Sequence, residues 1–79
     1  MVNSPQTVEE RRQKLMTYLA QNPGASELDM WDTLNVSDWD IDADIAYFRT
    51  NEWVRKVGNS RWSLTEEGMA EAKAQHWID

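Results

Sequence analysis

Apolar residues recur at helical spacing in the middle of the chain. Ile41, Ile45 and Phe48 follow one another at steps of four and three, which places them on one face of an α-helix. Ser37 and Asp40 form a serine-x-x-acid start, in which the hydroxyl accepts a hydrogen bond from a free backbone N–H of the first turn. The pattern predicts a helix that begins at Ser37 and buries this apolar face.

Two further helices are predicted before it by the same kind of evidence. Thr7 with Glu10 forms a capping box, and Asn22-Pro23-Gly24 ends the helix that follows. Ser26 with Asp29 forms a similar capping pair at the start of a short second helix. Val8, Leu15, Tyr18 and Leu19 give the first helix one apolar stripe, and the second helix carries Leu28, Met30, Trp31 and Leu34.

A β-hairpin and a last helix are predicted after residue 52. Residues 53–57 and 61–64 are short, alternating, β-prone runs separated by Gly58-Asn59-Ser60. Thr65 caps a helix expected over residues 66–78, with Glu66 and Glu67 where the helix dipole favours negative charge. The expected fold is mainly α with a small β-hairpin, in the order helix, helix, helix, hairpin, helix.

This arrangement resembles the winged helix-turn-helix family over nearly the whole chain, from about Thr7 to the end. The positions that the family uses for its recognition helix and the start of its wing are filled by Ser37, Ile41, Ile45, Phe48, Trp53 and Val54. Leu64-Thr65-Glu66-Glu67-Gly68 is similar to the family's entry into its final helix. The resemblance implies a DNA-associated regulator rather than an enzyme.

The chain departs from the family pattern at three places. Asn51-Glu52 stands where the family has a glycine before the wing, so we expect Asn51 to take the left-handed conformation. Trp31 stands where a small residue packs against the recognition helix, so we expect the two helices to be spread apart. The positions that face base edges in the family hold no cation: they are Trp39, Asp40, Asp42, Ala43 and Ala46.

Length and composition are consistent with one small domain. The 79 residues are expected to form a single winged-helix domain from residue 7 to 79, with a disordered segment over residues 1–6. The chain has no cysteine, which excludes disulfides and thiolate metal sites. No segment has the pattern of a signal peptide or a membrane span. We therefore expect a cytoplasmic protein with no membrane partner.

The net charge of −6 argues against general affinity for phosphate backbones. Cations nevertheless gather around the predicted wing, where polar residues also occupy the tip. The candidate nucleic-acid-binding residues are Arg49, Arg55, Lys56, Asn59, Ser60 and Arg61. The first hypothesis is weak, salt-sensitive binding of DNA led by the wing.

The alternative hypothesis is a protein-interaction module. The predicted solvent face of the third helix offers Trp39, Asp40, Ala43 and Tyr47 for docking a partner with a basic surface, steered by Asp38, Asp40, Asp42 and Asp44. Trp39 has two interpretations: an exposed contact residue, or a staple folded back over Leu34 or Val36. The sequence leaves both open.

The run of alternating aspartates does not predict a metal site. A calcium loop needs glycine where this chain has Ala43 and a bidentate glutamate where it has Arg49. His76 is the lone histidine and has no nucleophile that the sequence pairs with it. We expect no metal, no cofactor and no enzymatic activity.

The last helix could mediate a homodimer. Met69, Ala72, His76 and Trp77 would form that contact. Alternatively, Met69 and Ala72 pack on the first helix of the same chain.

Overall fold

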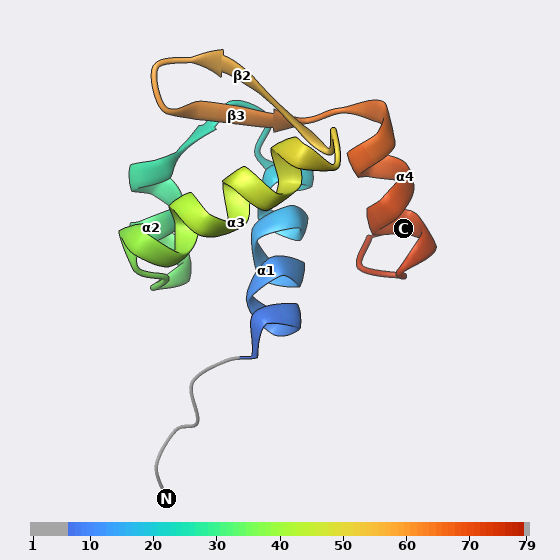
Figure 1. Ribbon diagram of the computed structural model, residues 1–79, viewed down its shortest axis with the longest axis horizontal. Helices are drawn as coiled ribbons and strands as arrows, with labels where there is room; N and C mark the ends of the chain where they lie inside the picture. The colour runs from blue at the N-terminus through green and yellow to red at the C-terminus, as the bar shows by residue number, and fades with distance from the viewer. Residues whose placement is uncertain (1–6, 79) are drawn as a thin grey trace, which may run out of the picture.

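The computed structural model describes residues 7–78, which form four helices and three short strands. The helices are α1 (Val8–Gln21), α2 (Glu27–Leu34), α3 (Asp38–Thr50) and α4 (Glu66–Ala74), and the strands are β1 (Ala25–Ser26), β2 (Val54–Gly58) and β3 (Arg61–Leu64). The sheet crosses the top of the view in Figure 1, with α1 and α3 beneath it and α2 and α4 on opposite sides. The predicted order of helices and hairpin is confirmed. The predicted disorder of residues 1–6 lies outside the described residues.

All four helices begin where the sequence predicts. In each case a hydroxyl accepts a backbone N–H three residues later, which satisfies one of the free donors of the first turn. The N–H to hydroxyl distances are 3.1 Å from Glu10 to Thr7, 3.0 Å from Asp29 to Ser26, 3.2 Å from Asp40 to Ser37, and 3.0 Å from Gly68 to Thr65. The last helix is shorter than predicted, because the backbone turns back at His76 (φ 62°) and Trp77 N donates to the carbonyl of Ala72 at 2.9 Å.

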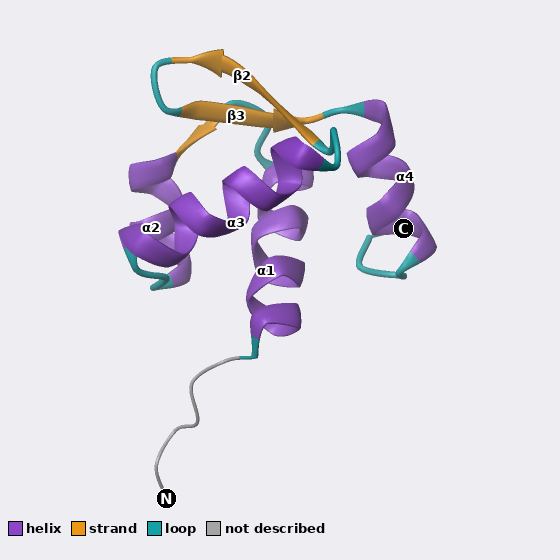
Figure 2. Cartoon of the chain, in the orientation of Figure 1, coloured by secondary structure: helices purple, strands orange, loops and turns teal. Residues whose placement is uncertain are grey.

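The sheet has a strand that the sequence did not predict. Its order is β1-β3-β2, all antiparallel, and Ala25 in β1 pairs with Trp62 in β3. Figure 2 shows the three strands gathered at one end of the molecule. Two residues carry no periodicity, so β1 is defined only by its pairing with a strand far along the chain.

The core lies between α1, α3 and the inner face of the sheet. The buried apolar residues are Leu15, Met16, Leu19, Ala25, Met30, Val36, Ile41, Ile45, Phe48, Val54, Trp62 and Ala72. The predicted buried face of α3 is therefore confirmed, and Trp62 of β3 is buried with it. Trp53 is half-buried beside Phe48, with ring centroids 6.2 Å apart.

The second helix is more exposed than its apolar content predicts. Met30 is its one fully buried residue, whereas Leu28 and Trp31 are 66% and 47% exposed. Trp31 is half exposed and Met30 fills the core position of α2, while the expected separation of α2 from α3 stays a prediction.

The connection from α3 to the wing also differs from expectation. Asn51 has φ −89°, and Glu52 takes the left-handed conformation with φ 61°. The turn therefore forms one residue later than predicted. It brings Trp53 next to the first turn of α4. The Trp53 carbonyl lies so close to Gly68 that a Cβ on residue 68 would overlap this carbonyl.

No helix within residues 7–78 combines the length and the apolar character needed to cross a bilayer.

Candidate functional site

The wing, defined as β2, β3 and the turn between them, is closed by Asn59-Ser60. Ser60 has φ 54°, the left-handed backbone that tight hairpin turns require, and a register shift between Lys56 and Gly58 places a bulge before it. The carbonyl of Ser60 accepts a hydrogen bond from Glu27 N at 2.9 Å. The tip of the wing is therefore attached to the start of α2.

Every predicted nucleic-acid-binding side chain is exposed: Arg49, Arg55, Lys56, Asn59, Ser60 and Arg61. Two of the cations lie on the inner side of the wing. Lys56 is opposite Trp62 in the antiparallel register, and the Arg49 Cζ lies 5.4 Å from the centroid of the Trp62 ring. Because directly opposed residues share a face, Lys56 and Arg49 both border Trp62.

The other two cations lie on the outer side. Neighbouring residues of a strand point to opposite faces, and Arg55 precedes Lys56 just as Arg61 precedes Trp62. Arg61 Nε also donates to the carbonyl of Gly24 at 2.8 Å. The predicted residues are thus divided between two faces of the wing and do not form one surface.

Arg11 and Arg12 are bound to a single carboxylate of α3. Arg11 donates from Nε to Asp44 Oδ2 at 2.5 Å and from Nη2 to Oδ1 at 2.8 Å, and Arg12 Nε donates to Oδ1 at 3.2 Å. The Asp44 side chain is 0% exposed. The hydrogen bond from Arg11 to this carboxylate raises the pKa of the Arg11 guanidinium above its usual value.

The prediction that Asp44 lies on the exposed face of α3 is therefore wrong. Asp44 follows Ile41 by three residues and precedes Ile45 by one, so it falls within the buried stripe. Its charge is stable there because the two guanidinium groups satisfy both carboxylate oxygens. The adjacent pair Arg11-Arg12 in an otherwise acidic chain was the one sequence signal for such a partner.

Two of the four predicted docking residues also face α1. Arg11 Nη1 lies 3.6 Å from Asp40 Oδ1, and the Arg12 Cζ lies 3.6 Å from the centroid of the Tyr47 ring. Asp40 and Tyr47 are consequently engaged within the domain.

Trp39 and Ala43 lie on a different side of α3. With Asp42 they line an open hollow of about 400 Å³. Trp39 is 84% exposed, so the interpretation in which it folds back as a staple is wrong and the exposed-contact interpretation describes its position. Of the four predicted docking residues, Trp39 and Ala43 share this hollow with Asp42, and docking by the four stays a prediction.

The carboxylate of Glu27, at the start of α2, contacts the wing and lies near the aspartates at the start of α3. Trp62 Nε1 donates to Glu27 Oε2 at 3.1 Å. Burial raises the pKa of Glu27; the bond from Trp62 opposes this shift, while the nearby carboxyls of Asp42 and Asp38 reinforce it. The inner side of the wing and the acidic end of α3 thus meet at Glu27.

The last helix, α4, packs against the core of its own chain. Ala72 is 0% exposed, and Trp77 is half-buried against the core. The predicted dimer contact through Met69, Ala72, His76 and Trp77 would need both side chains free. The structure instead agrees with the alternative in which the last helix packs within the domain.

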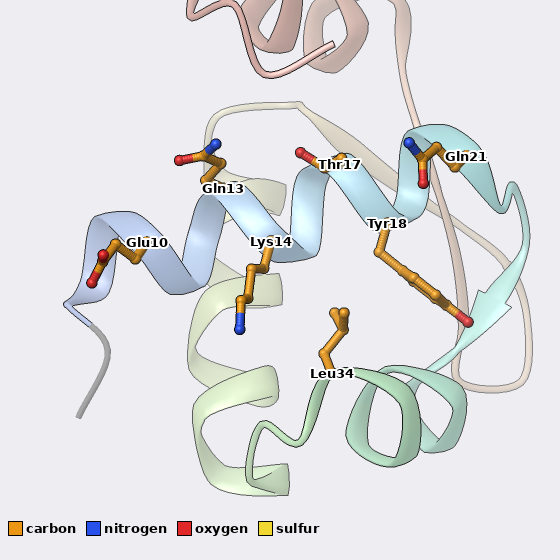
Figure 3. Close-up of a pocket in the computed structure, with 7 residues that line it drawn as sticks. All are labelled: Glu10, Gln13, Lys14, Thr17, Tyr18, Gln21 and Leu34. Carbon is orange, nitrogen blue, oxygen red and sulfur yellow. The ribbon is translucent and has the colours of Figure 1, made fainter. Parts of the chain in front are cut away.

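A hollow between α1 and α2 was not anticipated from sequence. It has a volume of about 410 Å³ and is lined by Glu10, Gln13, Lys14, Thr17, Tyr18, Gln21 and Leu34. Figure 3 shows Leu34 of α2 pointing toward α1, between the side chains of Lys14 and Tyr18. Its lining contains no histidine.

Within residues 7–78 no three histidine, aspartate or glutamate side chains are grouped as metal ligands. The carboxylates of α3 diverge around the helix, and Asp44 is occupied by arginines. His76 is exposed beyond the end of α4.

The comparisons with known proteins establish the fold. No family model matches the chain, and no curated protein matches it in sequence. Among solved structures it is similar to Lactococcus lactis ZitR, wild type, with a TM-score of 0.72, 18% sequence identity and 96% of this chain covered. The match spans 54% of the ZitR chain. The fold is a winged helix-turn-helix, as the resemblance implied.

Proposed function

We propose that residues 7–79 act as a single winged-helix module of a DNA-associated regulator in the cytoplasm, and that the module contacts nucleic acid weakly through its wing. The fold is one that regulators use to bind DNA, and the proposal assigns no catalysis to it.

The observation that carries this proposal is the distribution of the cations. Six lysine and arginine side chains are not bound to Asp44, and four of these lie exposed on the wing or on the adjacent end of α3: Arg49, Arg55, Lys56 and Arg61. Cations at a wing are suited to phosphate contact, which supplies most of the non-specific affinity for a duplex.

Weak binding follows from the rest of the surface. The first turns of α3 expose Asp38, Trp39 and Asp42 where a duplex would approach, and carboxylates repel phosphates at short range. Because the wing cations are divided between two faces, only about two of them can contact one duplex. The inner pair, Arg49 and Lys56, lies on the side of α3, so we assign the phosphate contacts to that pair.

The test is a titration of a labelled random-sequence duplex at several salt concentrations, followed by fluorescence anisotropy. Two phosphate contacts predict a slope of about −2 in the logarithm of affinity against the logarithm of salt. Arg49→Ala and Lys56→Ala should each reduce this slope by about 1. The matched controls Lys14→Ala and Lys73→Ala remove the same charge from exposed positions on α1 and α4 and should leave it unchanged.

The proposal fails if the wild-type chain does not bind the duplex at low salt. It also fails if the control variants lower the slope as much as the wing variants, since net charge alone would then explain binding.

A second function is favoured by one observation, the 84% exposure of Trp39 beside Asp42 and Ala43. Aromatic anchors are enriched at the centres of protein interfaces, and a negative surround favours a basic partner. In this alternative the hollow at Trp39 docks a basic segment of another protein.

A displayed library of lysine- and arginine-rich peptides tests the alternative. Peptides selected on the wild-type chain should lose at least tenfold in affinity for Trp39→Ala and retain it for Lys73→Ala. Selected peptides that bind Trp39→Ala equally well would exclude this face as the docking site.

A further inference from the structure

One side of α3 is left uncovered by the rest of residues 7–78. Trp39, Ala43, Ala46 and Thr50 follow one another at steps of four, three and four, so they lie in one row along the helix, and all four are exposed. Trp39 is 84% exposed, and burying an indole removes on the order of 150–250 Å² from water. An exposed aromatic side chain of this kind is typical of a surface that a protein partner covers.

The shape of this row suits a second copy of the same helix. Beyond Trp39 the side chains are small, and Thr50 Oγ1 donates to the carbonyl of Ala46 at 3.0 Å, so its hydroxyl is satisfied within the helix. Small side chains let two helices approach to about 8–10 Å between their axes. In an antiparallel pair related by a two-fold axis between Ala43 and Ala46, each Trp39 lies opposite Thr50 of the second copy, where there is room for the indole.

The charges beside the row match the same antiparallel pairing. Asp38, Asp42 and Arg49 lie along one side of it, with the acids in the first two turns of α3 and the arginine in the last. A two-fold axis brings the same side of each helix together. In the register given above, Arg49 of each copy lies level with the space between Asp38 and Asp42 of the other. The surface is therefore complementary in charge to a second copy of itself.

These charges are not matched within the chain. Among residues 7–78, Asp38, Asp42 and Arg49 form no ion pair. Arg49 is two turns beyond Asp42, about 10 Å along the helix axis, which is too far for contact. Burial raises the pKa of Glu27, and the neighbouring carboxyls of Asp42 and Asp38 raise it further. The acids thus crowd together without a cation of their own chain between them.

We propose that the chain forms a two-fold symmetric dimer in which α3 packs antiparallel against α3 of a second copy. Trp39 packs on Ala46 and Thr50 of the second copy, and Arg49 pairs with the Asp38 and Asp42 carboxylates of that copy. This inference goes beyond the proposed contact of the wing with DNA and does not rest on it. It gives the Trp39 face a second copy of this chain as its partner, with Arg49 as the basic group.

The first test is the molecular mass of the full chain in solution as a function of concentration, measured by sedimentation equilibrium without nucleic acid. One pair of 13-residue helices is a small interface, so the wild type should dimerise with a Kd on the order of 100 µM at low salt. Added salt should weaken the dimer because exposed ion pairs are screened. A chain that stays monomeric at about tenfold above this Kd, or that forms assemblies larger than a dimer, overturns the proposal.

Reversed charges identify the contact. Asp42→Arg places two arginines opposite Arg49, and Arg49→Asp places two aspartates opposite Asp42, so each variant alone should dimerise at least about tenfold more weakly. An equal mixture of the two variants restores both pairs of opposite charge and should dimerise within about threefold of the wild type. Recovery in the mixture also shows that both variants fold. A mixture no better than its components contradicts the antiparallel register.

Matched controls separate this contact from net charge. Glu67→Arg and Lys73→Asp make the same two changes of charge at exposed positions of α4, and both should dimerise as the wild type does. Trp39→Ala changes no charge and should weaken the dimer at least about tenfold, since aromatic anchors carry much of the affinity of an interface. Equal loss in the α4 variants, or an unchanged dimer in Trp39→Ala, would exclude α3 as the interface.

Discussion

The two halves of the surface around α3 carry opposite charge. Residues 27–44 contain seven carboxylates and no lysine or arginine, whereas residues 49–61 contain four cations and one carboxylate, Glu52. The net charge of −6 describes neither region. A net charge therefore argues against general affinity for DNA but gives no information about a local surface that could still bind it.

The two regions also differ in what explains their charges. Asp38 and Asp40 lie in the first turn of α3 and Arg49 in its last, where the helix dipole stabilises each sign. Stability of the helix thus accounts for much of the acid on α3 without any partner. Lys56 lies on a β-strand, where no such dipole acts, so its presence is better evidence for a binding surface.

Asp44 is the exception within the acidic region, and replacing it should have the largest effect. Asp44→Asn leaves Arg11 and Arg12 without their shared carboxylate, and loss of one partner from a buried ion pair typically costs about 3–5 kcal/mol. Because the two arginines are 15% and 29% exposed, we expect the lower part of that range, about 3 kcal/mol of unfolding free energy. Urea denaturation measures it.

The control is Asp42→Asn, two residues earlier on the same helix and exposed. It should change stability by no more than about 0.5 kcal/mol. Equal stability of the two variants would mean that the Asp44 cluster does not stabilise the fold.

The contrast between these aspartates marks the limit of prediction from sequence. Each helix start was predictable because its capping bond joins residues three apart, as in Thr7 with Glu10 or Ser37 with Asp40. The burial of Asp44 depends on Arg11, which is 33 residues away. Periodicity in one helix carries no information about a partner on another.

The same limit explains the remaining differences. β1 exists because Ala25 pairs with Trp62, a contact between distant segments. Glu52 rather than Asn51 takes the left-handed turn, although propensity favours asparagine, and Trp53 N then donates to the carbonyl of Phe48 at 2.8 Å. Arg55 and Lys56 point to opposite faces because neighbouring strand residues alternate, but which of them shares a face with Trp62 depends on the strand register, which only the structure supplies.

Glu27, at the junction of the two regions, should give a smaller and pH-dependent effect. Burial raises the pKa of Glu27, so the folded chain retains this proton to higher pH than the unfolded chain does. Its contribution to stability is present below the ordinary glutamate pKa and is lost as pH rises through the raised value. Glu27→Gln cannot titrate and still offers an oxygen to Trp62 Nε1.

The stability of the wild type relative to Glu27→Gln should therefore fall as pH rises from about 4 to about 7. Urea midpoints of both proteins across this range test the sign. Parallel curves, or a relative gain for the wild type toward neutral pH, would contradict the assigned shift.

Trp39→Ala should have the smallest effect on folding, and that result would be informative. A buried tryptophan removes on the order of 150–250 Å² from water, yet Trp39 is 84% exposed in a domain with few residues available for a core. Its removal should change the unfolding free energy by no more than about 0.5 kcal/mol, measured by urea denaturation. A loss above about 1 kcal/mol would mean that the indole covers Leu34 or Val36 in solution. A null result would mean that folding does not depend on this indole, and it would allow Trp39→Ala to be used in binding experiments without a correction for unfolding.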